Sequence, residues 1–304
     1  MTSLFCRHNR LTAKCPICSK ELEAELRAKA PPRTRPARPA RPSSSASPRA
    51  RRTAARQPGG LVTKRLARAE DDGYRNPLLP GLRATADAER LAGALTAAAQ
   101  RLAPPGPYDA VDEEADPEQA TWLALLLALV GPDAPEIQAA VAEAPPRWAD
   151  GEVPDLPGVD PRTIGAYRQW AVRAGSQEAA FTGEPDWTPQ RRFARVFERL
   201  ALPGFTRAAR FELLATLGAA DLYPLEADSL QLGVEDDAAT LAAKRVLQSG
   251  DRMLLERRAR DLAGAAELPL EAFDRGLAVW VTPGAHMDLT EELPAAVRAA
   301  FGLR

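Results

Sequence analysis

Beyond position 18 this chain of 304 residues contains no cysteine. Its three cysteines are Cys6, Cys15 and Cys18, and they lie beside His8, one of only two histidines. An odd number of cysteines and the lack of a secretory signal argue against a disulfide framework. The order, Cys-x-His followed by Cys-x-x-Cys, is instead typical of a small structural zinc site.

Three thiolates and one imidazole complete a tetrahedral shell around zinc, so no position stays open for a catalytic water. We therefore predict a zinc knuckle over residues 1–26, in which the metal is structural. The alternative is a set of free thiols that cluster by chance, and the lack of cysteine elsewhere argues against it. Any chemistry must then lie in another part of the chain.

Aromatic residues make up only 6% of the chain, and β-branched residues are also sparse, whereas alanine and leucine dominate. This composition favours helices over strands. No apolar run reaches the roughly 18 to 20 residues that span a bilayer. The longest run, 122–130, is half that length and indicates a buried helix. We expect an all-α, cytoplasmic protein with no membrane partner.

No acidic residue occurs between Glu25 and Glu70, a stretch that contains thirteen Lys and Arg and is rich in Pro, Ser and Ala. Residues 69–304 carry 23 basic and 38 acidic side chains, although the whole chain has a net charge of −1. A stretch of this composition cannot bury a core, so we predict a disordered basic linker over 27–70. It is either a solvated tether or a segment that binds polyanions, and its unopposed cations favour DNA.

Residues 71–304 show the periodicity and the start signals of helices. One helix is predicted from Asp87, with Leu91, Leu95 and Leu102 on one stripe. The next helix opens at Asp116-Pro117, and later ones open at Pro, Thr, Asp or Arg. These later helices span Pro161–Ala174, Pro189–Leu200, Thr206–Leu217, Asp237–Gln248, Arg252–Ala263 and Pro269–Val281. Because no useful strand pattern appears, this part is predicted to be an all-α domain.

A tight turn, Leu202-Pro203-Gly204-Phe205, joins two of these predicted helices. Backbone N–H groups at the start of the second helix can hold a phosphate, which makes Gly204 and Thr206 candidate DNA contacts. Six arginines surround the turn with a single acid, Glu198. They are Arg191, Arg192, Arg195, Arg199, Arg207 and Arg210. The alternative is an ordinary corner between helices, with solvated arginines.

The turn resembles the hairpin of the helix–hairpin–helix DNA glycosylase superfamily, which has a Leu-Pro-Gly-Val-Gly type turn. In that superfamily a catalytic Asp follows some two dozen residues later, at the start of the next helix. Here Asp228 is 24 positions after Gly204, and Ala227-Asp228-Ser229-Leu230 resembles the Val-Asp-Thr-His stretch of the superfamily. The likeness covers roughly residues 115–285.

Two shorter stretches, Ala-Arg-Phe at 209–211 and Ala-Ala-Lys-Arg at 242–245, are similar to one branch of the superfamily. This is the branch named for alpha-glutamyl/putrescinyl thymine pyrophosphorylase, which is proposed to release hypermodified bases from DNA. The chain departs from the superfamily in two ways. Thr206 replaces the second hairpin glycine, and no lysine follows it at the place of the nucleophile of the bifunctional members. We therefore expect no strand cleavage.

The resemblance implies a monofunctional DNA glycosylase that acts on a flipped-out modified or damaged base. Asp228 would stabilise the oxocarbenium-like sugar and activate the attacking water. The alternative is that Asp228 only caps a helix beginning at Ser229, and Glu226 is the reserve candidate for catalysis. The predicted phosphate contacts beyond the turn are Arg207, Arg210, Lys244 and Arg245.

Other features of the sequence carry less weight. A second Leu-Pro-Gly-Val, at 156–159, has no acid at the matching distance and is predicted to be a plain turn. His286 has no partner and is expected to be structural. The acidic run 235–237 is expected at a helix N-terminus. Two further functions stay open, a non-catalytic DNA-binding protein on the same fold and a zinc-stapled adaptor that binds protein.

Overall fold

The computed structural model describes residues 69–103, 109–233, 237–285 and 292–303, which belong to a single unit, Thr63–Arg304. Helices are the only regular secondary structure within these ranges, so the prediction of an all-α domain is confirmed. The predicted zinc ligands and residues 27–68 of the predicted linker lie outside the described residues. In the described part of the chain, no helix has the length and apolar character needed to cross a membrane.

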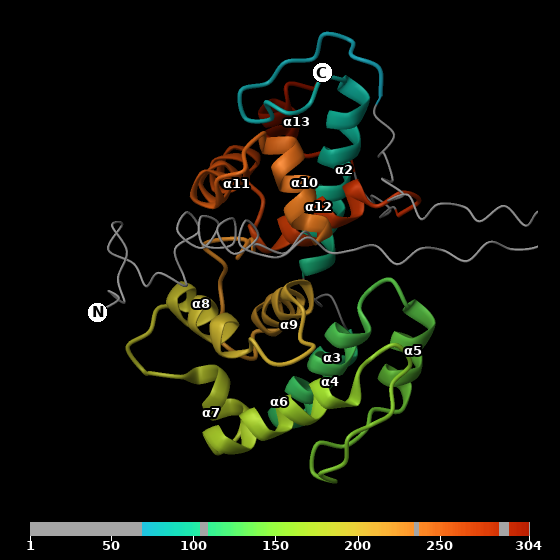
Figure 1. Cartoon of the computed structure of the whole chain (residues 1–304), viewed down its shortest axis with the longest axis vertical. Helices are drawn as coiled ribbons and strands as arrows, with labels where there is room; N and C mark the ends of the chain where they lie inside the picture. Colours follow the sequence, from blue (N-terminus) through green and yellow to red (C-terminus); the bar gives the residue numbers. More distant parts are fainter. Residues whose placement is uncertain (1–68, 104–108, 234–236, 286–291, 304) are drawn as a thin grey trace, which may run out of the picture. The chain divides into compact units, whose positions relative to one another are not determined.

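The helices form two groups that are joined through α9. One group comprises α2 (Thr85–Leu102), α10 (Ala238–Leu247), α11 (Arg252–Ala266), α12 (Glu271–Val281) and α13 (Ala295–Phe301). The other comprises α3 (Asp109–Asp112), α4 (Pro117–Val130), α5 (Pro135–Glu143), α6 (Pro161–Ala174), α7 (Gln177–Thr182), α8 (Pro189–Arg199) and α9 (Arg207–Ala219) (Figure 1). Helix α9 packs against α4 and α8 of its own group and against α2 and α12 of the other. It is therefore the central helix of the fold.

Local sequence signals set most helix starts. Six helices begin directly after an Asp or Thr whose side chain accepts a backbone N–H of the first turn, as expected of N-caps. These caps are Asp116, Asp160, Thr188, Thr206, Asp237 and Asp251. The predicted starts of these six helices are confirmed to within one residue, whereas α2 begins two residues before the predicted Asp87 and α12 begins two residues after the predicted Pro269. Asp237 thereby fulfils the prediction of an acid at a helix N-terminus, and the predicted turn at 156–159 is also present.

Four helices, α3, α5, α7 and α13, are absent from the sequence-based prediction. None of them exceeds nine residues. So few turns show little periodicity, and helices of this length depend on tertiary packing for their stability. Their existence could therefore be learned only from the folded chain.

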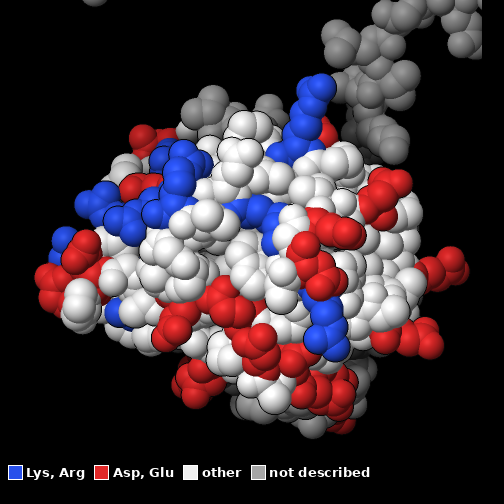
Figure 2. Space-filling view, turned by 90° about the horizontal axis from the view of Figure 1, so that it is seen from below, with Lys and Arg blue, Asp and Glu red and all other residues white. Residues whose placement is uncertain are grey.

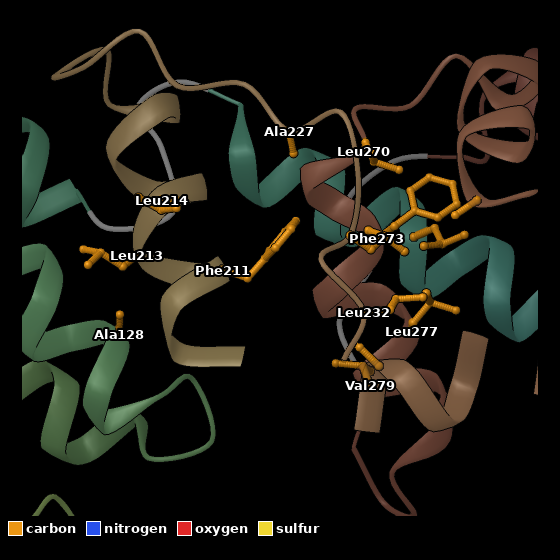
Figure 3. Close-up of a cluster of buried hydrophobic side chains, with 14 of the residues drawn as sticks. Ala128, Phe211, Leu213, Leu214, Ala227, Leu232, Leu270, Phe273, Leu277 and Val279 are labelled. Atoms are coloured by element: carbon orange, nitrogen blue, oxygen red, sulfur yellow. The ribbon is translucent and has the colours of Figure 1, made fainter. Parts of the chain in front are cut away.

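The hydrophobic core runs through both groups and meets along α9. Figure 3 shows Leu213 of α9 on the side of Ala128 in α4, whereas Phe211 points to the other side, toward the strand-like segment that carries Leu232. In the first group α2 and α12 lie close together at Gly276, where a Cβ atom would be 2.9 Å from the Cα atom of Leu95. This contact places α12 firmly beside α2.

Four of the tryptophans contribute to the interior of the second group of helices. Trp122 and Trp187 are buried, and Trp148 and Trp170 pack against the core. Trp122 and Trp148 have ring centroids 5.2 Å apart, and both rings lie next to Tyr167. These aromatic contacts stabilise the second group of helices.

A candidate site on the segment between α9 and α10

The segment that follows α9, residues 220–233, contains no helix. Asp228 lies within it and is exposed. The expectation of a helix starting at Asp228 or Ser229 is therefore wrong, and the cap of the next helix is Asp237. Asp228 thus has no capping role that would account for its presence in the segment.

Burial alternates along residues 223–228, which belong to no helix or strand. Tyr223, Leu225 and Ala227 are buried, whereas Glu226 and Asp228 between and after them are exposed. This period of two is the pattern of a strand with one buried face. It explains why no helix forms here, because a helical backbone would turn the buried residues toward solvent.

Four charged side chains from four helices hold the segment by its backbone. Arg192 of α8 donates to the carbonyl of Pro224 at 3.0 Å, and Arg207 of α9 donates to that of Leu230 at 3.0 Å. The other two side chains are carboxylates. Glu256 of α11 accepts the N–H groups of Leu230 and Leu232, each at 2.7 Å, and Glu271 of α12 accepts that of Ala227 at 2.5 Å.

Burying charged groups is unfavourable unless they are paired and hydrogen-bonded. Arg192, Arg207 and Glu256 are each at most 6% exposed. Their concentration on one short segment indicates that the position of its backbone matters, and preorganised functional sites are supported in this way. In the part of the segment that these side chains hold, from Pro224 to Leu232, the exposed carboxylates are Glu226 and Asp228. We take these two groups as the candidate site.

Arg207 does not lie where a phosphate could reach it. Only 2% of the residue is exposed, and its guanidinium pairs with Asp237 and, at 2.5 Å, with Asp274. The prediction of Arg207 as a DNA contact is therefore corrected, and this side chain joins the starts of α9 and α10 to α12. Arg192 is also buried, so it does not belong to the predicted positive surface either.

The buried cluster of Arg207, Asp237 and Asp274 has two carboxylates for one cation. Burial raises the pKa of Asp274 from its ordinary 3.8 to about 6, although Arg207 acts in the opposite direction. The pKa of Asp237 is lowered, because its hydrogen bond and charge interaction with Arg207 outweigh its own burial. Of the two carboxylates, Asp274 is therefore the one whose charged form the cluster disfavours.

This shift predicts how stability depends on pH. Between pH 3.8 and 6 the folded chain holds the proton of Asp274 more tightly than the unfolded chain does. The group therefore contributes less stability as pH rises through this window. Relative to the variant Asp274→Asn, the wild type should gain about 2 kcal/mol in unfolding free energy when pH falls from 7 to 4.5. Urea titrations of both proteins at the two pH values measure this difference, and parallel pH profiles would contradict it.

The remaining predicted DNA contacts have protein partners in the structure. The guanidinium of Arg210 donates to the carbonyl of Phe197 at 3.1 Å and lies over the ring of that residue. Arg245 lies 4.7 Å from the ring of Trp280, with its side chain 13% exposed. Lys244, next to Arg245, is half-buried in the last turn of α10. Arg210 and Lys244 remain accessible in part, whereas Arg245 is mainly a packing residue.

The turn between α8 and α9 is built as a tight hairpin. Gly204 has a φ of +77°, and a Cβ atom at this position would be 2.1 Å from the hydroxyl of Thr163 in α6. Only glycine fits both constraints. Thr206 is exposed, and its hydroxyl accepts the N–H of Ala209 as the cap of α9. Gly204 and Thr206 thus lie together at the solvent-facing start of α9.

One side of α8 carries an exposed arginine stripe, which we define as Arg191, Arg195 and Arg199. Their spacing of four residues places them on the same face of the helix. Arg199 also lies over the ring of Trp187, 4.8 Å from its centroid. Figure 2 shows several basic side chains close together toward the left of the face it displays, others at the top and the lower right, and acidic side chains over much of the remainder.

The other predictions fall outside the described residues. These include the zinc ligands Cys6, His8, Cys15 and Cys18, as well as His286 and residues 235–236. In the ranges that are described, no three His, Cys, Asp or Glu side chains are grouped closely enough to hold a metal ion.

Comparisons with models of protein families, with curated proteins and with solved structures gave no match for this chain. The residues themselves and their arrangement in the fold are therefore what any functional proposal rests on.

Proposed function

We propose that this chain is a monofunctional DNA N-glycosylase whose catalytic residue is Asp228. The observation that carries the proposal is the position of Asp228 on a non-helical segment that four charged side chains hold by its backbone. An exposed carboxylate on so fixed a segment is suited to act on a group that arrives from solution, such as an extruded nucleotide.

In the proposed reaction the bond between C1′ of the deoxyribose and the base nitrogen breaks, and its electron pair leaves with the base. The ionised carboxylate of Asp228 stabilises the positive charge that develops on the sugar. It then accepts a proton from the water that adds to C1′, and the departing base is protonated from solvent. The products are a free base and an abasic site. No lysine in the hairpin is available for a Schiff base, so the strand stays intact.

The hairpin supports the DNA part of this proposal. The arginine stripe runs along α8 toward the turn, and Gly204 and Thr206 present the start of α9 to solvent. Cations beside a helix N-terminus suit the phosphates of a DNA backbone. Arg210 and Lys244, both in part accessible, can extend this contact. These contacts are to the DNA backbone and not to the damaged or modified base. They therefore do not depend on the identity of the base.

We expect the triple variant in which Arg191, Arg195 and Arg199 become Ala to bind duplex DNA more weakly than the wild type. Loss of three phosphate contacts should reduce the slope of log K against log salt by about 2 to 3. Fluorescence anisotropy at several salt concentrations measures this slope. A matched control replaces three exposed arginines of α11, Arg252, Arg257 and Arg260, by Ala. Equal losses in both triple variants would show that binding is not local to the hairpin.

The N-terminal part of the chain enters the proposal as an accessory. In this proposal a structural zinc is held by Cys6, His8, Cys15 and Cys18. The zinc knuckle and the basic stretch after it, which ends near Arg68, would raise the local concentration of the catalytic domain on DNA. Catalysis at Asp228 does not pass through the metal, because a closed four-ligand shell has no open position.

The zinc proposal predicts one metal ion per chain. Metal analysis of the purified full-length protein should find about one zinc, and Cys15→Ser and Cys18→Ser should each lose it, because a tetrahedral site needs all four ligands. His286→Ala changes the only other histidine and should keep the metal. Retention of zinc in both cysteine variants would rule out this ligand set.

A second candidate function is a DNA-binding protein without catalysis. The position of Asp228 favours it in one respect, because this carboxylate does not start a helix as the resemblance implies. In that case the hairpin contacts DNA and the exposed carboxylates have no reaction to perform. This candidate is supported if the protein retains DNA but releases no base from any of the modified genomes tested.

A further inference from the structure

The inner side of the same segment borders a cavity of about 370 Å³. It lies where α2 and α9 end and α12 begins. Leu102 of α2, Ala219 of α9, Leu225 and Pro269 form apolar walls. Among the described residues that line it, Glu271 alone carries a charge. A cavity of this size is at the lower end of the range that binds small molecules.

The carboxyl group of Glu271 has an unusual environment. One of its oxygens accepts the N–H of Ala227 at 2.5 Å. Burial raises the pKa of Glu271, and the charge of Glu226 raises it further. Glu271 is half-buried, and a half-buried carboxylate whose neighbour is another carboxylate has an unfavourable excess of negative charge. The C-terminal ends of α2 and α9 add partial negative charge, although the start of α12 acts in the opposite direction on Glu271 itself.

We propose that this cavity binds a small primary alkylammonium ion. Its ammonium group would pair with the carboxylate of Glu271, and its aliphatic body would lie against Leu102, Ala219 and Leu225. An anion would be repelled by the carboxylate of Glu271, and a neutral apolar molecule would leave this carboxylate without a counter-ion. An ammonium ion with a short carbon chain can pair with this carboxylate and also pack against the apolar walls of the cavity.

The proposal goes beyond base release and does not depend on it. Glu271 links the cavity to the candidate site, because its carboxylate accepts a hydrogen bond from the N–H of Ala227, the residue before Asp228. A ligand that keeps Glu271 ionised would also keep this hydrogen bond charge-assisted and therefore strong. The ligand would then stabilise the segment in the position described here.

Isothermal titration of the full-length protein with n-pentylammonium chloride at pH 8 tests the proposal. We expect saturable binding that is at least about tenfold tighter than that of 1-pentanol, its neutral analogue. The variant Glu271→Gln, whose amide oxygen can still accept the Ala227 N–H, should bind the ammonium ion at least about tenfold more weakly. Affinity in the wild type should also fall at pH 5, because the raised pKa of Glu271 brings protonation within reach.

A second variant separates the cavity from a general effect of charge. Ala219→Phe leaves Glu271 in place and fills the cavity from the end of α9, a partly exposed position that should tolerate the larger side chain. It should also lose at least about tenfold in affinity. The proposal is overturned if the wild type shows no saturable binding, if 1-pentanol binds equally well, or if either variant binds like the wild type. Because the readout is binding heat, an absence of base release would leave this result intact.

Discussion

Replacing Asp228 with Asn should lower the rate of base release by a factor on the order of 10³, the size of effect seen when a group that stabilises transition-state charge is removed. Asparagine has nearly the same shape but cannot carry the negative charge that stabilises the developing cation or accept the proton of water. DNA binding should be almost unchanged, because the hairpin and the arginine stripe are intact. Single-turnover release of free base, followed by mass spectrometry, measures the effect.

Glu226→Gln is the matched control for this prediction. Glu226 is also an exposed carboxylate on the same segment, two residues from Asp228, and its side chain accepts a hydrogen bond from Gln190 at 2.6 Å. Glu226→Gln should retain base release within a few-fold of the wild type. The reverse result, with activity lost in Glu226→Gln and kept in Asp228→Asn, would transfer the catalytic role to Glu226.

The second large effect concerns stability. Arg207→Met should lower the unfolding free energy by about 3 to 5 kcal/mol, because it leaves the buried carboxylate of Asp274 and the half-buried carboxylate of Asp237 without a counter-ion. It also removes the hydrogen bond to the carbonyl of Leu230. Urea unfolding at pH 7.5 measures the change. Arg191→Met replaces an exposed arginine of the hairpin and should change stability by no more than about 0.5 kcal/mol.

A double variant tests whether charge is the cause. Adding Asp274→Asn to Arg207→Met removes one of the two uncompensated charges, so part of the lost stability should return. If Arg207→Met proves as stable as Arg191→Met, the three-residue cluster does not hold the fold as described. If the double variant is no more stable than Arg207→Met, lost packing and not charge explains the effect.

The helices with strong local signals could be predicted from the sequence. A capping Asp or Thr fixes the start of α6, α8 and α10, for example, and such a signal depends on neighbouring residues alone. The hairpin turn at Gly204 could be predicted for the same reason. The contact of this glycine with Thr163 could not, since it joins residues 41 positions apart.

The candidate site required the folded chain. Six arginines around one turn indicate a positive surface, yet Arg207 is buried because Asp237 and Asp274 meet it from two other helices. Arg192 offered a signal that was missed, because it lies one turn before Val196 on the apolar face of α8. The alternation of apolar residues at 223, 225 and 227 with Pro224, Glu226 and Asp228 could likewise have indicated that no helix begins at Asp228.

The most direct test of the proposed function is to incubate wild-type protein with genomic DNAs that carry different modified or damaged bases. The free bases and the DNA strands are then analysed by mass spectrometry and denaturing electrophoresis. We predict that at least one DNA yields a free base together with uncleaved strands that contain abasic sites. Retention of the DNA with no base released from any of them would contradict a glycosylase.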